Sequence, residues 1–383
     1  MATPVALYVH VPWCRHVCPY CDFNVHATTA APEADDVPAL IAELAAHTSQ
    51  PAWAGRPAAT VYFGGGTPSL LSPAAIAALL DAIRSRCGTT DDVEVTLEAN
   101  PGTVDRERLD GYRRAGVNRL SLGTQSFRAD VLRTLGRDHA AGDTATAVAA
   151  ARAAGFASIS LDLIFAVPGQ TLAAWDDDLA SAVALAPEHV STYSLTYEEG
   201  TPFHRWRTSG RVEPIDDDTE SLMADAAAER LAAAGLVRYE ISSWARPGHA
   251  SRHNTRYWDG SDYLGLGAGA HSFCATPFPG RRWMNVRHPS QWRAAVTADG
   301  TAIATEESLD VAVARGEFVM TGLRRIAGVD LAAFAARFGV SLDVAFPHTV
   351  GLERDGLLER ADGRLRLAPQ GLRFADTVSA TYL

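Results

Sequence analysis

Residues 6–21 read Ala-Leu-Tyr-Val-His-Val-Pro-Trp-Cys-Arg-His-Val-Cys-Pro-Tyr-Cys, with cysteines at positions 14, 18 and 21. The apolar and β-branched run 6–11 predicts a buried strand. The cysteines follow that strand directly in a C-x3-C-x2-C spacing, which places them on one loop. Three thiolates on one loop can hold three irons of a 4Fe-4S cluster. The fourth iron is then free to bind a small molecule through amino and carboxylate groups.

A structural zinc site is the alternative interpretation of the same spacing. Zinc would need a fourth ligand, and His10, His16 and His26 are near enough in the sequence to supply it. The spacing favours the cluster but leaves zinc open. Cys87 and Cys274 are isolated, so we interpret them as small apolar residues and not as disulfide partners.

Outward from the cysteines, strand patterns alternate with helical patterns as far as about residue 235. The predicted strands are 6–11, 60–64, 93–98, 118–123, 158–164 and 189–196. The predicted helices are 36–48, 73–86, 105–115, 142–154, 171–185 and 217–234. This alternation predicts an α/β fold over residues 1–235, a parallel sheet curved into a partial (β/α)6 TIM-like barrel with helices outside. Ligands are then expected at the carboxyl ends of the strands.

The rest of the chain departs from this rhythm. We expect residues 236–305, rich in Trp, Tyr, Gly, Arg and His, to cover the mouth of the barrel. Residues 306–383 predict a winged-helix-like α+β domain, with a hairpin over 356–367 that turns at Asp362-Gly363. The helices predicted in this domain are 308–323, 330–338 and 342–355.

The charge balance excludes some classes of partner. The chain has 34 basic and 45 acidic residues, a formal net charge of −11, which argues against nucleic acid and against anionic lipid surfaces. We therefore expect the winged-helix-like domain to serve packing or protein contact. The sequence has no apolar run long enough for a transmembrane helix and no basic segment typical of a signal peptide, so we expect a cytoplasmic protein.

Residues 7–24, LYVHVPWCRHVCPYCDFN, resemble the opening of the HemN/HemW branch of radical S-adenosylmethionine (SAM) proteins. The resemblance continues through the Gly-rich stretch 64–69, through 98–101 and 123–127, and through Leu161-Asp162-Leu163, and it covers essentially the whole chain. It implies that Cys14, Cys18 and Cys21 hold a 4Fe-4S cluster. It also implies that the cluster-bound SAM is held by Tyr8, Gly65 and Glu98. A second SAM would be held by Tyr20, Gly66, Thr67, Gln125, Arg137 and Asp162.

His253-Asn-Thr-Arg-Tyr257-Trp258 matches the HNxxYW hallmark of the HemW-type haem chaperones in that branch. The resemblance implies haem binding, with His253 as the candidate iron ligand and Tyr257 and Trp258 as walls for the ring. The coproporphyrinogen oxidases of the branch carry a further cysteine after the motif, where this chain has Asp22-Phe23. That departure weighs against coproporphyrinogen oxidation.

Three hypotheses follow. The first is a haem chaperone that passes haem to a respiratory acceptor protein. The second is a class C radical SAM methyltransferase that uses two SAM molecules and a 5′-deoxyadenosyl radical to methylate an sp2 carbon of a natural-product, peptide or tetrapyrrole-like substrate. The third, a nucleic-acid-binding regulator with the cluster as a redox sensor, is disfavoured by the net charge.

The methyltransferase hypothesis draws on one departure from the family pattern. The family reads Tyr-Gly-Leu-Pro-Gly-Gln after the fifth strand, whereas this chain has Phe165-Ala166-Val-Pro-Gly-Gln170. We expect this change to alter the wall beside the second SAM. The resemblance also allows a low-potential electron donor such as flavodoxin or ferredoxin, a homodimer and a peripheral membrane contact.

Overall fold

The computed structural model describes residues 3–383 and builds them around one sheet of twelve strands. Six neighbouring strands in this sheet are parallel and follow one another in chain order. They are β1 (Val5–Val11), β4 (Ala58–Gly65), β5 (Thr89–Ala99), β6 (Arg119–Gln125), β7 (Ile159–Phe165) and β8 (His189–Ser194). All six predicted strands are therefore present. Because β1 and β8 pair with other strands and not with each other, the barrel stays open.

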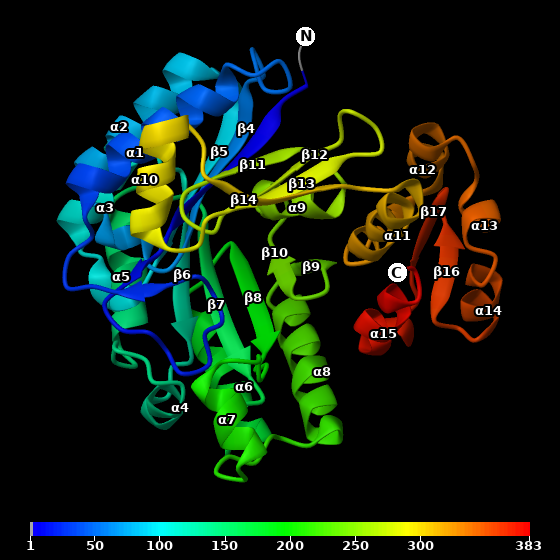
Figure 1. Cartoon of the computed structure of the whole chain (residues 1–383). Helices are drawn as coiled ribbons and strands as arrows, with labels where there is room; N and C mark the ends of the chain where they lie inside the picture. Colours follow the sequence, from blue (N-terminus) through cyan, green and yellow to red (C-terminus); the bar gives the residue numbers. More distant parts are fainter. Residues whose placement is uncertain (1–2) are drawn as a thin grey trace.

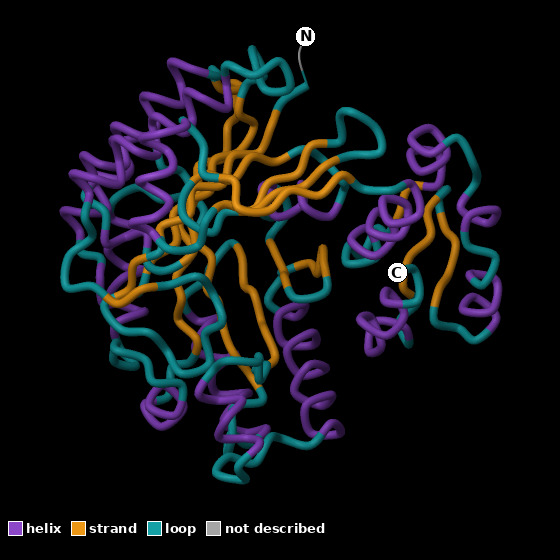
Figure 2. The backbone as a smooth tube through the Cα atoms, in the orientation of Figure 1, coloured by secondary structure: helices purple, strands orange, loops and turns teal. Residues whose placement is uncertain are grey.

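The predicted helices form the outer layer of the barrel (Figures 1 and 2). They are α1 (Glu33–Thr48), α2 (Pro73–Arg86), α3 (Arg106–Ala115), α5 (Asp143–Ala153), α6 (Leu172–Ala184) and α8 (Asp217–Ala233). Local sequence explains their ends: Ser72 caps α2 by accepting a hydrogen bond from the Ala75 amide, with Pro73 at the first helical position. Two short helices in the loops, α4 (Ala129–Thr134) and α7 (Pro202–Thr208), were not predicted.

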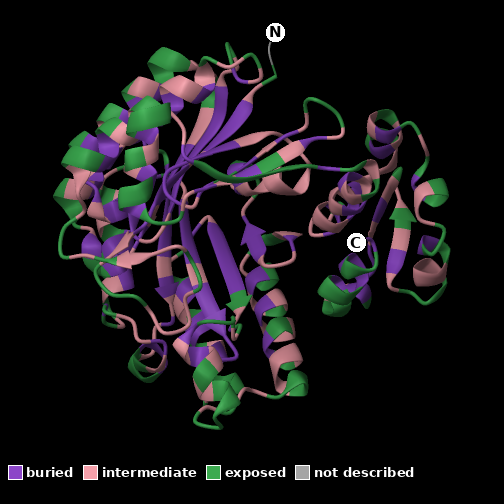
Figure 3. Cartoon of the chain, viewed as in Figure 1, coloured by how far each residue is buried: buried purple, intermediate pink, exposed green. Residues whose placement is uncertain are grey.

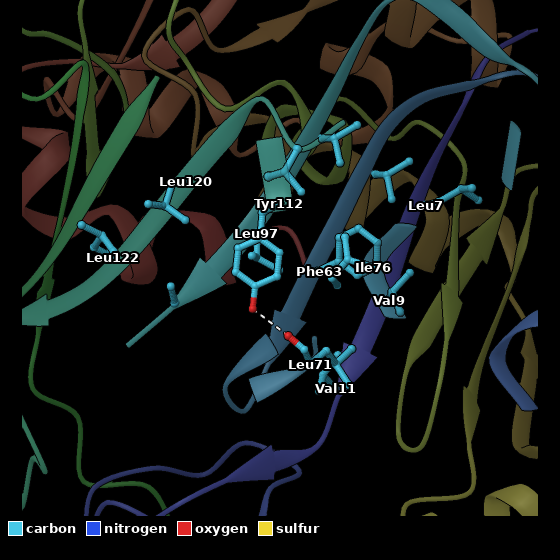
Figure 4. Close-up of a cluster of buried hydrophobic side chains, with 14 of the residues drawn as sticks. Leu7, Val9, Val11, Phe63, Leu71, Ile76, Leu97, Tyr112, Leu120 and Leu122 are labelled. Atoms are coloured by element: carbon cyan, nitrogen blue, oxygen red, sulfur yellow. Dashed lines mark hydrogen bonds between the residues drawn. The ribbon is translucent and has the colours of Figure 1, made fainter. Parts of the chain in front are cut away.

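The apolar core lies between the sheet and these helices, as Figure 4 shows for part of it. Alternate side chains of each strand enter this layer. On β6, for example, Leu120 and Leu122 are fully buried in it. Tyr112 of α3 spans the layer and donates a hydrogen bond from its hydroxyl to the Leu71 carbonyl at 2.6 Å. Because the apolar core fills the outer layer, the other set of side chains faces the concave side of the sheet. Figure 3 shows that the strands are largely buried, whereas the outer faces of the helices are exposed.

Residues 236–308 extend the same sheet at both edges. Beyond β8 lie the antiparallel strands β10 (Ser243–Ala245) and β9 (Val237–Glu240). Beyond β1 lies parallel β11 (Tyr263–Leu266), followed by antiparallel β12 (His271–Cys274), β13 (Arg281–Asn285) and β14 (Ile303–Ser308). Two helices, α9 (Arg252–Trp258) and α10 (Pro289–Asp299), complete this region.

The expectation that this region covers the mouth of the barrel is wrong for α9. Its first residues contact the side chains of Thr60, near the amino end of β4, and of Glu94 on β5. The cysteines follow the carboxyl end of β1, at the opposite end of the parallel strands. Helix α9 therefore closes the bottom of the barrel, a placement set by the pairing of β11 with β1.

The C-terminal residues form a separate small core, as expected for an α+β domain (Figure 1). Its three-stranded sheet has the order β15 (Val329–Asp330), β17 (Arg364–Leu367), β16 (Leu358–Ala361). Its helices are α11 (Val311–Gly322), α12 (Leu331–Phe338), α13 (Leu342–Ala345), α14 (Thr349–Arg354) and α15 (Ala375–Ala380). Asp362 and Gly363 both have positive φ angles, 52° and 73°, which confirms the hairpin turn. The single helix predicted over 342–355 is divided, because Pro347 prevents Phe346 from continuing α13.

Among residues 3–383, none of the helices combines the length and the apolar composition that crossing a bilayer requires.

Candidate functional site

A cavity of about 410 Å³ lies on the concave face of the sheet, beneath the loop that carries the cysteines. Its walls come from that loop and from the inward-facing residues of β4 to β8. Of the residues predicted to bind cluster or SAM, all but one line it: Cys14, Cys18, Tyr20, Cys21, Gly65, Gly66, Thr67, Glu98, Gln125, Arg137 and Asp162. The structure thus brings together residues from six separate loops and strands.

Backbone pairing fixes the base of the cysteine loop. The short strands β2 (Trp13–Cys14) and β3 (His26–Ala27) pair in parallel at the base of the loop. The chain at Gly66 and Thr67 supports it from below, through hydrogen bonds from their amides to the carbonyls of Val11 and Trp13. Any side chain at Gly66 would collide with this support, since a Cβ atom there would lie 2.6 Å from the Trp13 carbonyl oxygen.

The three thiols fit a cubane cluster better than a zinc ion. All three are free and partly buried, and all three face the cavity. Within residues 3–383, no group of three or more His, Cys, Asp or Glu side chains converges on a point that could hold one metal ion. A cubane does not require such convergence, because each thiolate binds a different iron. Burial raises the pKa of Cys21 to about 11, so bound iron would have to displace the thiol proton.

Arg137 provides positive charge beside this loop. Its Nη1 atom lies 3.6 Å from Cys18 Sγ, and its Nη2 donates to the Gly123 carbonyl at 3.0 Å. The guanidinium therefore sits where it can stabilise a thiolate at Cys18 or meet a ligand carboxylate.

The residues predicted for the cluster-bound SAM meet at Glu98. Its carboxylate accepts hydrogen bonds from the Tyr62 hydroxyl at 2.7 Å and from the Gly65 amide at 3.1 Å. Burial raises the pKa of Glu98 to about 7, while these hydrogen bonds act in the opposite direction. Tyr8 is the one predicted residue in this set that does not line the cavity; its ring stacks on Tyr62, with centroids 6.2 Å apart. Tyr62 thus connects Tyr8 to Glu98, and this role was not predicted from the sequence.

The residues predicted for a second SAM occupy the opposite wall. Asp162 accepts a hydrogen bond from Ser121 at 2.9 Å, and burial raises its pKa. Gln125 has a φ of 63°, a left-handed conformation that a non-glycine residue rarely adopts. The β6–β7 register shifts between Leu122 and Gln125, so the strained residue lies at an irregularity that ends at the cavity.

The polar floor of the cavity was not predicted from the sequence. Inward-facing positions on three strands contribute it: Arg119, Ser121, Ser160, His189 and Ser191. The available signal was the alternation of polar residues within predicted strands, as in Arg119-x-Ser121, Ser160-x-Asp162 and His189-x-Ser191.

His253 lies below this floor and not in the cavity lining. It is 1% exposed, and its ring stacks on Tyr62 with centroids 4.9 Å apart. Its Nδ1 shares a hydrogen bond with the Thr60 hydroxyl at 2.8 Å, and its Nε2 shares one with the Tyr257 hydroxyl at 2.9 Å. Burial lowers its pKa to about 3, so the ring is neutral. Haem iron could reach this residue only by displacing one of these partners, whereas neighbouring Asn254 does line the cavity.

These contacts predict a structural role for His253. Replacing it in His253→Ala should lower the free energy of unfolding by about 3 kcal/mol, because two buried hydrogen bonds and the ring packing are lost. Denaturant unfolding measures this, with exposed His348→Ala as the matched control. Haem binding per folded molecule should be unchanged. A variant of normal stability that fails to bind haem would instead establish His253 as the iron ligand.

The departure at Phe165-Ala166 does not alter the cavity wall, which corrects the expectation drawn from the sequence. Phe165 points into the outer layer, where its ring lies 5.4 Å from that of Trp175. Ala166 is also buried in that layer, and only Ile164 of this stretch faces the cavity. Ala166 has a φ of 57°, a backbone conformation that explains why glycine suits this position.

Comparison with known proteins agrees with this site. The Radical SAM superfamily model matches residues 8–182, and the HemN C-terminal domain model matches residues 309–374. Three similar relatives are each named heme chaperone HemW: those of Escherichia coli K12 (36% identity, covering 99% of this chain and 98% of the relative), Bacillus subtilis 168 (35%; 98% and 98%) and Mycobacterium tuberculosis H37Rv (37%; 99% and 95%).

A solved structure agrees on the fold. The structure of coproporphyrinogen III oxidase (HemN) from Escherichia coli superposes with a TM-score of 0.85 at 23% identity, covering 100% of this chain and 90% of that one. These relatives give no support to the methyltransferase hypothesis. With identities above one third over nearly complete chains, and with the cysteine loop and cavity in place, the chain belongs to the HemW family of the radical SAM superfamily.

Proposed function

We propose that the chain binds haem and delivers it to a haem-accepting respiratory protein, with a 4Fe-4S cluster and SAM held in the cavity as supporting groups. The observation that carries this proposal is the full-length similarity to proteins named heme chaperones. Because that similarity includes the C-terminal domain, it extends beyond what a shared SAM-binding domain would explain.

The mouth of the cavity supports haem binding by its chemistry. Three large side chains that line the cavity are exposed to solvent: Val17 (38%), Phe23 (63%) and Tyr193 (43%). Val17 and Phe23 belong to the cysteine loop, and Tyr193 belongs to β8. Exposed apolar groups that gather at a cavity mark a binding surface, and a flat porphyrin ring matches them.

The residues below this mouth suit SAM. When bound, the cluster would supply an open iron that the amino and carboxylate groups of SAM can coordinate. Gly65 allows close approach of a ligand, because its φ of 114° and the nearness of His10 exclude a side chain there. Glu98 can accept a hydrogen bond from a ribose hydroxyl or an ammonium group, and Arg137 can meet a carboxylate. Asp162 and Gln125 give the opposite wall the polar groups that a second SAM would use.

The raised pKa of Glu98 predicts a pH dependence of SAM binding. Below about pH 7 this carboxyl is protonated and accepts hydrogen bonds poorly, so SAM affinity should rise as the pH increases through about 7. The same shift makes folding less favourable as the pH rises from the ordinary value of 4.5 to about 7, because the folded chain holds the proton more tightly.

Isothermal titration of SAM into the cluster-loaded chain at several pH values measures the effect. Glu98→Gln should bind more weakly and with a flat pH profile. The role assigned to Glu98 is wrong if the wild-type profile is also flat, or if the variant keeps the slope.

Titration of haem into the cluster-loaded chain tests the proposed function. We expect a saturable Soret shift at one haem per chain. In Phe23→Ser the affinity should fall about tenfold, since the exposed ring that would cover the porphyrin is lost. Phe374→Ser is the matched control, because Phe374 is 50% exposed but belongs to the C-terminal domain. Iron content must be equal in all samples, since Phe23 is near Cys21.

Two results of this titration would contradict the proposal. No saturable Soret shift in the wild-type chain would contradict haem binding. Equal affinity in wild type and Phe23→Ser would show that haem binds elsewhere than at the cavity mouth.

A further inference from the structure

Arg119 is the first residue of β6, and its side chain faces the cavity floor, on the same side of the strand as Ser121 and Gly123. The residue is 3% exposed. Its Nε and Nη2 atoms are fully buried, and neither has a hydrogen-bond partner among residues 3–383. A charged guanidinium in this state is unusual, because buried charges are normally paired.

The neighbouring carboxylates are engaged elsewhere. Glu98 accepts from the Tyr62 hydroxyl and the Gly65 amide. Asp162 accepts from the Ser121 hydroxyl. Glu94 accepts from the backbone amides of Arg252 and His253 at the start of α9. All the ion pairs found within residues 3–383 join other residues, so the chain itself does not neutralise Arg119 through direct contact.

The remaining polar groups around the floor are neutral. Ser160 and His189 share a hydrogen bond of 2.7 Å, and His189 Nε2 shares another with the Tyr239 hydroxyl at 2.8 Å. Burial, together with the charge of Arg119, lowers the pKa of His189 well below its usual value. The floor therefore combines neutral hydroxyl and imidazole groups with a cation that has no direct partner, although its charge acts on the Asp162 carboxylate in the same cavity.

We propose that Arg119 binds a carboxylate group of a molecule that enters this cavity. A guanidinium N–H that reaches the cavity can donate to a carboxylate oxygen, and a hydrogen bond between two charged groups is strong where water is excluded. This inference deepens the proposed function and rests on it for the occupant of the cavity. Two molecules in that proposal carry the group: SAM has a methionine carboxylate, and haem has propionates.

The test compares each ligand with a partner that lacks free carboxylates. The probes are SAM, decarboxylated SAM, haem and haem dimethyl ester, each titrated into the full-length, cluster-loaded chain. In wild type, the probe that keeps the carboxylate bound by Arg119 should have a much higher affinity than its partner without that carboxylate. Arg119→Met should lower the affinity for that ligand by about 30-fold. Removing the carboxylate from that probe should then reduce its affinity for Arg119→Met much less than its affinity for wild type. The two losses are non-additive because both remove the same contact.

The matched control is Arg84→Met, which removes the same charge from the outer surface of α2, where the Arg84 side chain is 45% exposed. It should bind all four probes as wild type does. Ligand-free stability gives an independent readout. A structural arginine would leave Arg119→Met less stable, whereas an arginine that awaits a ligand leaves it equally or more stable, because an unpaired buried charge has been removed.

Non-additivity with the SAM pair assigns the carboxylate to SAM, and non-additivity with the haem pair assigns it to a propionate. Fully additive losses for both pairs, or unchanged affinities in Arg119→Met at normal iron content, would overturn the inference. That result would not affect the proposed function if haem still saturates the chain, so the two failures can be distinguished.

Discussion

Cys18→Ser should abolish binding of the iron–sulfur cluster and with it all SAM binding that depends on the open iron. Cys18 lies against Arg137, whose guanidinium is 3.6 Å from its sulfur and is placed to stabilise a thiolate. With one thiolate gone, two cysteines remain on the loop, one fewer than a 4Fe-4S cluster with a single open iron requires. Iron and sulfide analysis after anaerobic reconstitution, together with the visible absorbance of the cluster, measures the loss.

The fold should survive this change, because the apolar core lies in the outer layer and the cysteine loop contributes little to it. Cys87→Ser is the matched control, since Cys87 follows α2, far from the cavity lining. It should retain full iron content. A Cys18→Ser protein that still binds a full cluster would show that another residue completes the site and would remove the basis for assigning the three thiols.

Gly66→Ala should displace the cysteine loop, so cluster content should fall strongly although no cysteine is changed. The new Cβ would lie 2.6 Å from the Trp13 carbonyl oxygen and 3.0 Å from Cys14 Sγ. A backbone atom cannot rotate away as a flexible side chain can, so the loop itself must move. The expected cost in the free energy of unfolding is about 2 kcal/mol, typical of an overpacked site.

Gly142→Ala is the matched control for this clash, because its backbone has an ordinary φ of −84° and a Cβ there would have no neighbour within 4 Å. It should keep both stability and iron content. If Gly66→Ala also reconstitutes fully and melts as wild type does, then Gly66 does not hold the cysteine loop in place.

The sequence predicted the barrel well because buried parallel strands leave a strong local signal. Runs such as 6–11 and 158–164 are apolar and β-branched, and caps such as Ser72-Pro73 mark helix starts within one residue. Helices α4 and α7 were missed because six or seven residues are too few to show a helical period. The division at Pro347 was predictable from proline chemistry and was overlooked.

The position of α9 could not be predicted from local pattern. Its place at the bottom of the barrel depends on the pairing of β11 with β1, whose residues are more than two hundred positions apart. For the same reason His253 looked available for iron, whereas its partners Thr60 and Glu94 come from distant strands. The direction of Phe165 was in contrast readable from strand alternation, since it has the opposite parity to Asp162.

The SAM residues were transferred from a family resemblance, and the structure places all but Tyr8 around one cavity. That resemblance assigned no role to Arg119 or Tyr62. The inward parity of β6 identifies Arg119 as facing the cavity, but only the complete set of neighbours reveals that its guanidinium lacks a partner. Pairing is a property of the folded chain, and it is invisible in a linear sequence.

Haem transfer to an acceptor distinguishes delivery of haem from haem binding alone. The chain is loaded with one haem, freed of excess haem and mixed with membrane vesicles from a bacterium grown without haem, which contain respiratory proteins in the haem-free state. An excess of a soluble apo-haem protein is present to capture haem that is released. If the chain delivers haem, the acceptor in the vesicles gains haem and activity despite this scavenger. Haem that appears only on the scavenger, at the rate of spontaneous release, would contradict it.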